Sequence, residues 1–570
     1  MKKRLLIVAL TSLFSLGVGT SCSNKSSSSI ASECDDMFED CDKNSSSSAK
    51  KTVNLKSYTD DNYVYDTNVS NINGSMSYEI FVRSFYDSNN DGIGDLNGVT
   101  QKLDYLKDLG IKTVWLMPIN PSPSYHGYDV TDYYGIESDY GTMDDFTNLI
   151  AKAKEKNIDI MIDIVFNHSS IQHSWFQQSY QDYVNGYDGE DSYADWYNWS
   201  DNLKTGYSSY NGKYYECRFD SGMPDFNTEN VKVRNEMKKI LKYWVDKGVS
   251  GFRFDAVKYY DYENTSYNTE FLKDLHDDCV TYGKENYNKD IYFVGECWDN
   301  DNIVNKYYYS CFESFFRFSG SLDGSGKGAI LGAVKGINKA NDFGDAIEAN
   351  ETAIKKANPN AYSSYFLSNH DMNRASNSFT WDYGYMGASV LGLLPGTPYM
   401  YYGEEISLKG KRNTSPDDQS DARRRLPMIW SSTDKTGECQ FPETSRQDLK
   451  TNDQVSKGVD DQLTTNYSLL NHYKKVINIR NKYDFIKESI FKNLTKSITN
   501  EYNHVLIYSL TSKDGNVKIT IIHNFENENI ELDVSNLGTS IDAEVSCKKL
   551  IPELKDGILK LGSLSTVILK

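Results

Sequence analysis

The chain has 570 residues, 39% of them hydrophobic, which is enough for two to four domains with sizeable cores. Its 80 acidic and 61 basic residues give a net charge of −19, and no basic run interrupts the body of the sequence. Nucleic acid binding needs a concentrated positive surface, so the composition excludes nucleic acid as an expected partner.

The N-terminus has the pattern of a targeting segment. The basic residues 2–4 precede an apolar stretch, 5–18, that is too short to span a bilayer as a mature helix. Small residues ending in Cys22 follow and resemble a bacterial lipoprotein cleavage site, although Gly19 stands where Leu is usual. We predict a signal peptide over residues 1–21 and a lipid anchor on Cys22; ordinary secretion is the alternative. Both predictions place the protein outside the cytoplasm, as an extracellular or cell-surface protein.

Residues 22–71 are predicted to form a flexible tether. Two Ser runs, 26–29 and 45–48, surround an acidic patch, and a segment of this composition cannot bury a core. Cys34 and Cys41 lie within it, and the sequence leaves open whether they pair or stay free. The other cysteines lack metal-ligand spacing, so we predict no zinc site. No later segment is apolar enough to cross a membrane, so membrane contact is expected only through the lipid anchor.

From about residue 78, short apolar runs alternate with segments of helical period, which indicates repeated strand–helix units. Eight such strands close a parallel barrel, so we predict an α/β fold with a (β/α)8 TIM barrel over residues 72–168 and 223–488. The predicted strands cover residues 78–85, 113–117, 158–166, 251–255, 291–296, 314–318, 361–368 and 393–401.

Two further parts are predicted outside the barrel. The polar, Tyr-rich stretch 169–222, between strand 3 and helix 3, is too long for an ordinary connection and is predicted to be an inserted domain. Helical spacing over residues 469–483 predicts a helix that closes the barrel. From about residue 490 the pattern favours strands, so residues 489–570 are predicted to form a C-terminal antiparallel β-sandwich.

Three acidic residues stand at the ends of predicted strands four, five and seven: Asp255, Glu296 and Asp371. Barrel enzymes keep their chemistry at this end of the strands. A nucleophilic carboxylate and a general acid suffice for glycoside hydrolysis, and a third carboxylate can stabilise the positive charge on the sugar ring. Arg253 lies two residues before Asp255, on the same side of the strand, where it would keep Asp255 ionised. A single acid after a strand is most often a helix cap, so only the set is specific.

Four motifs around these acids closely resemble glycoside hydrolase family 13, the α-amylase family, and the resemblance covers roughly residues 72–570. The motifs are Asp163-Ile-Val-Phe-Asn167-His168, Gly251-Phe-Arg253-Phe-Asp255-Ala256-Val-Lys258, Gly295-Glu296 and Asn369-His370-Asp371.

The resemblance implies a role for each acid. Asp255 is the implied nucleophile, Glu296 the general acid/base and Asp371 the transition-state stabiliser. Family members retain the anomeric configuration, which predicts carboxyl groups of Asp255 and Glu296 about 5–5.5 Å apart. The resemblance also implies a set of residues that bind the reacting sugar, with Tyr128 as its stacking platform: His126, Tyr128, His168, Arg253, Lys258 and His370.

Residues 87–95 alternate oxygen-bearing side chains on a tight turn. Hard oxygen donors at this spacing suit calcium, although an Asn/Asp-rich turn without metal has the same composition. The segment is not an EF-hand, because its twelfth position is Gly98. The same loop binds calcium in related amylases, whereas Tyr259 replaces a His that helps to hold a second calcium in many of them. The implied Ca²⁺ ligands are the side chains of Asp87, Asn89, Asp91 and Asp95 and the carbonyl of Ile93.

Two positions bear on the bond that is cleaved. Tyr125 before His126 resembles endo-acting amylases, since exo-acting relatives tend to have Asp there. Ala256 resembles α-1,4 enzymes, whereas 1,6-cleaving relatives usually have Val. We therefore predict an α-amylase, a monomer that hydrolyses starch, maltodextrins and malto-oligosaccharides. The alternatives are a cyclomaltodextrinase or neopullulanase type, a 4-α-glucanotransferase and a non-catalytic starch-binding relative.

Overall fold

The computed structural model describes residues 53–57, 75–262, 264–321, 328–380, 382–412, 420–441, 457–499 and 501–570. The signal peptide, the lipid anchor and most of the tether lie outside the described residues and stay predictions, as does the pairing of Cys34 and Cys41. The six described cysteines are unpaired. Ser57 forms a β-bridge with Leu550, so this part of the segment predicted as a tether lies against the C-terminal domain.

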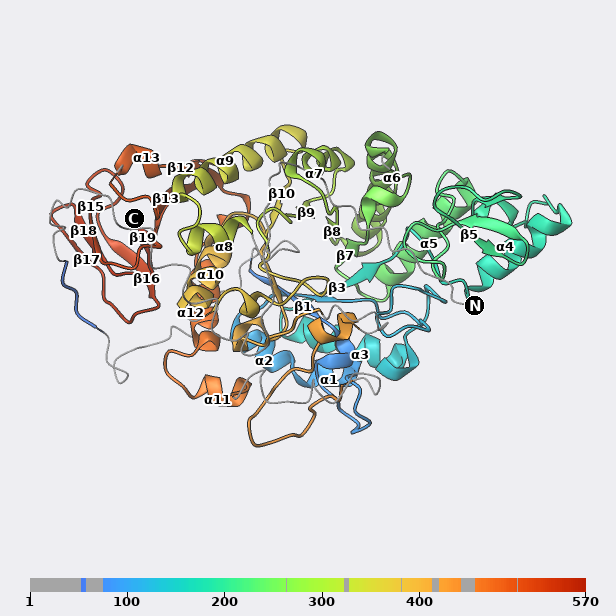
Figure 1. Cartoon of the computed structure of the whole chain (residues 1–570), viewed down its shortest axis with the longest axis horizontal. Helices are drawn as coiled ribbons and strands as arrows, with labels where there is room; N and C mark the ends of the chain where they lie inside the picture. The colour runs from blue at the N-terminus through green and yellow to red at the C-terminus, as the bar shows by residue number, and fades with distance from the viewer. Residues whose placement is uncertain are drawn as a thin grey trace, which may run out of the picture. The chain divides into compact units, whose positions relative to one another are not determined.

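Eight parallel strands form the central sheet, in the order β10-β9-β8-β7-β3-β2-β1-β11 (Figure 1). A bridge between Phe366 and Tyr399 brings the two edge strands together and nearly closes the barrel. The predicted parallel barrel is therefore confirmed. Its strands are β1 (Ser77–Ile80), β2 (Thr113–Leu116), β3 (Asp159–Ile164), β7 (Gly251–Phe254), β8 (Tyr292–Gly295), β9 (Ser314–Phe316), β10 (Tyr362–Ser364) and β11 (Tyr399–Tyr401).

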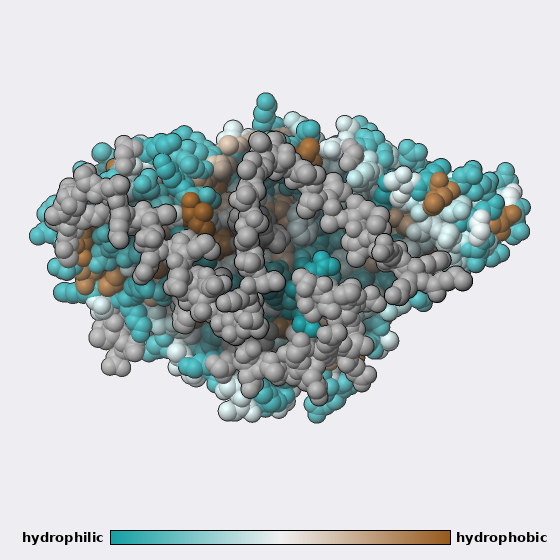
Figure 2. Space-filling model, in the orientation of Figure 1, coloured by the Kyte–Doolittle hydropathy of each residue, from teal (hydrophilic) through white to brown (hydrophobic). Residues whose placement is uncertain are grey.

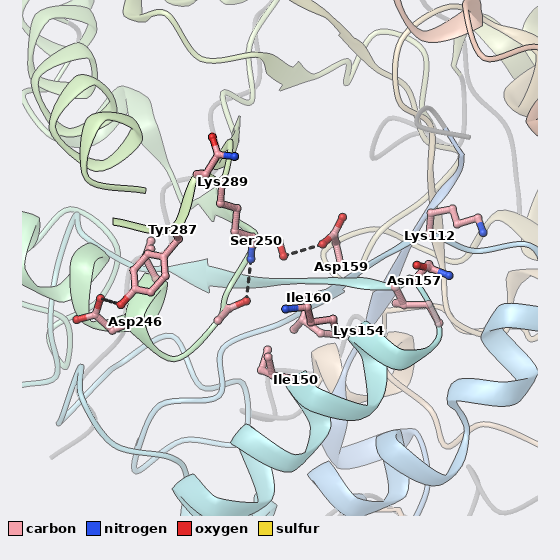
Figure 3. A pocket seen from close by; sticks show the side chains of 14 residues that line it. Lys112, Ile150, Lys154, Asn157, Asp159, Ile160, Asp246, Ser250, Tyr287 and Lys289 are labelled. Atoms are coloured by element: carbon pink, nitrogen blue, oxygen red, sulfur yellow. Dashed lines mark hydrogen bonds between the residues drawn. The ribbon is translucent and has the colours of Figure 1, made fainter. Parts of the chain in front are cut away.

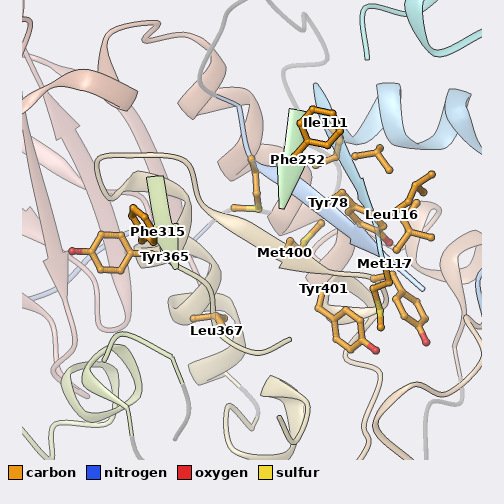
Figure 4. Packing of buried hydrophobic residues seen from close by; sticks show 14 of the residues in the cluster. Tyr78, Ile111, Leu116, Met117, Phe252, Phe315, Tyr365, Leu367, Met400 and Tyr401 are labelled. Carbon is orange, nitrogen blue, oxygen red and sulfur yellow. The ribbon is translucent and has the colours of Figure 1, made fainter. Parts of the chain in front are cut away.

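Along each barrel strand, one set of alternating residues faces the surrounding helices and the other set faces the barrel interior. Tyr78, Leu116, Phe252 and Met400 belong to the main hydrophobic cluster (Figure 4). A separate cluster made largely of the alternate residues fills the interior. A slip of one residue would place Arg253 among the apolar helix faces, so burial on both sides fixes the register. The strand residues of the interior cluster are Trp115, Met161, Val294, Phe316 and Tyr399.

Helices α3, α5 and α9 each bury one face, whereas residues 386–393 of α10 are all buried. Thr142 and Asp145 form a capping box at the start of α3. The predicted closing helix is confirmed as α12. The helices of at least six residues are α1 (Leu96–Gln101), α2 (Leu103–Leu109), α3 (Met143–Glu155), α4 (Ser174–Asn185), α5 (Val231–Asp246), α6 (Thr265–Tyr287), α7 (Asp301–Tyr307), α8 (Ala329–Val334), α9 (Ala340–Ala357), α10 (Asp382–Leu393) and α12 (Leu469–Asn481).

All eight predicted barrel strands are longer than the observed ones, and the first and the eighth show why. The first stops at Ile80, because the chain turns into a short 3₁₀ helix at Val82–Ser84. The eighth was predicted to start at Leu393, but this residue ends the buried helix α10. A short, continuous apolar run does not distinguish a buried helix from a buried strand, which explains the second error.

The inserted segment between β3 and α5 forms α4 and a three-stranded sheet of β4 (Trp199–Ser200), β5 (Tyr207–Tyr210) and β6 (Lys213–Glu216). Its small core is aromatic: the Phe176 ring lies 5.1 Å from Trp199 and 5.0 Å from Tyr215. This geometry buries a large apolar area with few residues.

The C-terminal residues form two antiparallel sheets, as predicted, with a hydrophobic cluster that both contribute to. The larger sheet has the order β12-β13-β14-β19-β16 and the smaller one β15-β18-β17. Within the described residues, no helix has the length and apolarity to cross a membrane. On the face shown in Figure 2, hydrophobic residues stand as separate patches among hydrophilic ones. The strands are β12 (Ile490–Asn493), β13 (Val505–Thr511), β14 (Lys518–Asn524), β15 (Ile530–Asp533), β16 (Ile541–Ser546), β17 (Glu553–Lys555), β18 (Ile558–Leu561) and β19 (Ser565–Leu569).

A cavity of about 670 Å³ lies where β2, β3 and β7 begin, at the opposite end of these strands from the acids (Figure 3). Polar side chains that line this cavity already form hydrogen bonds with neighbouring loop residues. Lys289 donates to the carbonyl of Gly248 at 3.0 Å, beyond the end of α5, and Ser250 donates to Asp159 at 2.8 Å. This end of a barrel serves stability rather than chemistry, so the candidate active site lies at the other end.

Candidate active site

The acids lie beyond the carboxyl ends of the barrel strands. Asp255 directly follows β7 and Glu296 directly follows β8, and both are buried, at 9% and 8% exposure. Asp371 lies in the loop after β10, and its side chain is 33% exposed. Parallel strands end on one face of the barrel, so three segments far apart in sequence bring their carboxyl groups toward one place.

One buried guanidinium joins the first two acids. Arg253 is fully buried, and its Nη1 donates to Asp255 Oδ1 at 2.6 Å and to Asp163 Oδ1 at 2.9 Å. Its Nη2 lies 3.6 Å from Glu296 Oε2. The structure therefore places Arg253 beside Asp255, as its spacing predicted, and adds Asp163 and Glu296 as partners. Two carboxyl groups that share one guanidinium can act on a single bond.

Glu296 is poised to carry a proton. Burial raises the pKa of Glu296 to about 7; the charge of Arg253 lowers it, and the charges of Asp255 and Asp371 raise it. The backbone N–H of Ala256 donates to Glu296 Oε2 at 2.8 Å and fixes the carboxyl group. A group with this pKa can give and take a proton near neutral pH.

Asp371 is held as a carboxylate by cations. His370 Nε2 lies 3.0 Å from Asp371 Oδ2, and Arg425 Nη2 donates to Asp371 Oδ1 at 3.0 Å. Burial by itself would raise the pKa of Asp371, but His370, Arg425 and Arg424 hold it well below its usual range. Arg424 also donates to the Asp371 backbone carbonyl. Neither arginine was among the predicted site residues; the run of three arginines at 423–425 in an acidic chain was the available signal.

The predicted sugar-binding residues form one aromatic cluster. The Tyr128 ring stacks on His370 at 5.5 Å with an interplanar angle of 15°, and the His126 ring lies 6.1 Å from Tyr128. His168 Nε2 lies 3.1 Å from the Tyr128 carbonyl. Burial lowers the pKa of both His126 and His168, so each is a neutral imidazole at neutral pH. Neutral imidazoles can donate to or accept from sugar hydroxyls.

Lys258 differs from this cluster, because its ammonium is already engaged. Lys258 Nζ donates to the Trp298 carbonyl at 2.8 Å and lies 3.4 Å from Asp299 Oδ2. It thus ties the segment after β7 to the segment after β8. The role that the structure offers Lys258 is to position the loop that follows Glu296.

The two positions that bear on the cleaved bond have distinct geometry. Ala256 has a positive φ of 48°, a conformation in which a β-branched residue is strained. The Tyr125 hydroxyl is buried without a hydrogen-bond partner in the described protein, and its ring packs on Phe81 at 5.3 Å.

Glu79 is a buried acid that the sequence analysis missed. It lies on β1 with 1% exposure, and its Oε1 is 2.5 Å from His370 Nδ1. The available signal was a charged residue at the second position of a predicted buried strand, 78–85. Such a residue is expensive unless it is paired, and His370 is the pair.

The predicted calcium loop closes on itself through its own amides. Asp87 Oδ1 and Oδ2 accept from the backbone N–H of Asn90 at 2.6 Å and of Gly92 at 2.7 Å. Asp95 caps α1 by accepting from the Gly98 N–H at 2.7 Å. Among the described residues, no three acidic, His or Cys side chains converge closely enough to hold a metal. The carboxylate, amide and carbonyl oxygens of the loop still match the donors that calcium prefers.

A parallel barrel that presents paired carboxyl groups around one arginine at its carboxyl end has the architecture of a glycoside hydrolase. The model of the alpha amylase catalytic domain matches residues 79–489. The chain therefore belongs to the α-amylase family, glycoside hydrolase family 13, and is a glycoside hydrolase.

Relatives align over most of the chain but differ in activity. Alpha-amylase 3 of Dictyoglomus thermophilum is 36% identical over 527 residues, covering 89% of this chain and 95% of that protein. The solved structure of Eubacterium rectale Amy13B matches with a TM-score of 0.79 at 35% identity, covering 88% and 96%. A 4-alpha-glucanotransferase of Thermotoga neapolitana is 30% identical over 353 residues, covering 59% and 72%. These relatives match the same chain, but their names include both an amylase and a glucanotransferase.

Proposed function

We propose that the protein is an α-amylase, a retaining endo-hydrolase of α-1,4-glucosidic bonds in starch and maltodextrins. The observation that carries this proposal is the single guanidinium of Arg253 between Asp255 and Glu296. Arg253 bonds Asp255 directly and orients its carboxyl group, whereas burial raises the pKa of Glu296 and favours its protonated form.

The reaction would proceed by double displacement. Asp255 attacks the anomeric carbon while Glu296 gives its proton to the departing glycosidic oxygen, which forms a covalent glycosyl-enzyme. Glu296 then takes a proton from water, the water oxygen attacks the anomeric carbon, and Asp255 is released. Asp371, fixed by His370 and Arg425, would stabilise the positive charge that develops on the ring.

The cluster of His126, Tyr128 and His168 would hold the reacting sugar, with the fully buried His370 stacked on Tyr128. An aromatic face packs against the apolar face of a pyranose, and the neutral imidazoles of His126 and His168 offer hydrogen bonds to its hydroxyls. Within this proposal, endo action rests on Tyr125 and α-1,4 preference on Ala256. The glucanotransferase relative keeps transfer to a second sugar as the principal alternative.

Product analysis distinguishes these activities. We expect amylose to yield a ladder of malto-oligosaccharides from the first minutes, with a fast fall in iodine staining, because an endo-enzyme cuts internal bonds. Pullulan and cyclodextrin should be cut at least about tenfold more slowly, since one unfavourable contact of about 1.4 kcal/mol in the transition state has this effect. Products longer than the substrate maltotetraose would show a transferase, and rapid opening of cyclodextrin would show the cyclomaltodextrinase type.

Replacement of the proton donor tests the mechanism. Glu296→Gln should lower kcat on starch by about 10³-fold, within the range of general acid–base catalysis. The wild-type rate should fall as pH rises through about 7, where Glu296 loses its proton. Glu405→Gln is the matched control, because Glu405 is equally buried but accepts from Tyr78 and Tyr105, away from the acids. A Glu296→Gln enzyme with the wild-type rate would contradict the proposal.

We propose that residues 87–95 bind Ca²⁺ as a structural ion. The side chains of Asp87, Asn89, Asp91 and Asp95 and the Ile93 carbonyl would supply oxygen ligands, and buried Asp87 and Asp95 would supply most of the charge. A chelator should then lower the Tm by at least about 5 °C, because a ligand that binds only the native state stabilises it. Asp91→Asn should show a smaller chelator effect, and an unchanged wild-type Tm would contradict calcium binding.

A further inference from the structure

We propose that Glu79 is a positioning residue that keeps His370 as an imidazolium beside Asp371. The inference deepens the proposed function, because it rests on the role of Asp371 in catalysis. It assigns a task to a buried strand residue that none of the four motifs contains, and it makes that task testable by its dependence on pH.

The geometry gives both ring nitrogens of His370 an acceptor. Nδ1 lies 2.5 Å from Glu79 Oε1, and Nε2 lies 3.0 Å from Asp371 Oδ2 and 2.7 Å from the Tyr128 hydroxyl. The Tyr128 hydroxyl donates to Asp163 Oδ2 at 3.2 Å, so its oxygen is left to accept from Nε2. A neutral imidazole has only one N–H, and only the imidazolium can donate in both directions.

Burial leaves no solvent to replace either partner. His370 is 0% exposed and Glu79 is 1% exposed. In the described part of the chain, Glu79 forms an ion pair with His370 and with no other cation. A carboxylate buried in this way is costly unless its partner is charged, so the pair favours the imidazolium.

The other groups that face His370 are either uncharged or directed at other partners. From β2, the Trp115 ring meets the imidazole edge at 5.7 Å and carries no charge. Arg425 donates to the His370 backbone carbonyl at 3.2 Å, and its Nη2 is directed at Asp371. The guanidinium of Arg253 lies over the Tyr128 ring at 5.9 Å and binds Asp163. The two carboxylates in direct contact, Glu79 and Asp371, therefore dominate.

The net effect of these surroundings is to raise the pKa of His370. Burial lowers the pKa of His370, but the charges of Asp371 and Glu79 and their hydrogen bonds raise it to about 9. His370 thus carries its charge throughout the neutral range and loses it as pH rises through about 9. Removing the charge of Glu79 removes one of the two carboxylates that raise the pKa of His370, so His370 would lose its charge closer to neutral pH. Asp371 would then lose one of the cations that contact it, at a pH where the wild-type enzyme keeps it.

The first test measures His370 itself in the full-length protein. Imidazole resonances are titrated by NMR with ¹³C-labelled histidine, and His370→Asn identifies the resonance among the eight histidines. In Glu79→Gln the midpoint should move down by roughly one to two pH units, as expected for loss of a carboxylate in contact. Glu405→Gln, which alters a buried carboxyl group elsewhere, should leave it in place. An unchanged midpoint in Glu79→Gln would overturn the inference.

The second test measures kcat on maltoheptaose across pH. Glu79→Gln should work within about threefold of the wild-type rate below pH 6, where its His370 is still charged. It should fall to about a tenth of the wild-type rate near pH 8, because one pKa unit corresponds to a tenfold change in population. Glu79→Asp, which keeps the charge, should restore most of the rate at pH 8.

The outcomes separate positioning from mere structure. A Glu79→Gln defect of equal size at every pH, or no rescue by Glu79→Asp, would overturn the inference. If the wild-type protein hydrolysed no glucan, the proposed function would fail, while the NMR titration would still test the contact between Glu79 and His370.

Discussion

The charge of Arg253, buried at the centre of the barrel, is the constraint on which the site depends. A fully buried guanidinium is costly, and three carboxyl groups offset that cost: Asp163 from β3, Asp255 after β7 and Glu296 after β8. These contacts require β3, β7 and β8 to be adjacent and in register, which the sheet order provides. Loss of one partner in such a buried group typically costs about 3–5 kcal/mol, so the electrostatics of the site also stabilise the barrel.

A second group of charges lies beside the first and involves the opposite part of the barrel. Glu79 on β1 contacts His370, His370 contacts Asp371, and Arg425 contacts Asp371 from the segment after β11. Tyr128 lies between the two groups, since its hydroxyl bonds both His370 and Asp163. Three cations thus face five carboxyl groups, and burial raises the pKa of two of these, Glu296 and Asp163, to about 7. The carboxyl groups outnumber these cations, so the buried site favours protonation of some of its acids, and Glu296, which the proposed mechanism needs as the proton donor, is one of the two with a raised pKa.

Much of this arrangement could be predicted from the sequence, because a buried parallel strand is a short apolar run and its end is visible as the first polar residue. Asp255 and Glu296 were found in this way. Arg253 was placed beside Asp255 because residues two positions apart on a strand point to the same side. Glu79 could not be assigned, because its partner His370 is 291 residues away in sequence. Arg425 was missed for the same reason, and the start of β11 was misplaced because residues 386–393 of α10 are buried and mostly apolar, like a buried strand. Non-local electrostatic partners and buried helices leave no periodic signal in one sequence.

The central claim is that Asp255, bonded to Arg253, attacks the sugar while the buried, protonated Glu296 moves the proton. The most direct measurement is to trap the glycosyl-enzyme with a fluorinated maltosyl fluoride that reacts quickly and hydrolyses slowly, and to sequence the labelled peptide by mass spectrometry. The account predicts one sugar adduct on Asp255. An adduct on Glu296, or turnover of the reagent with no covalent adduct on any residue, would contradict it.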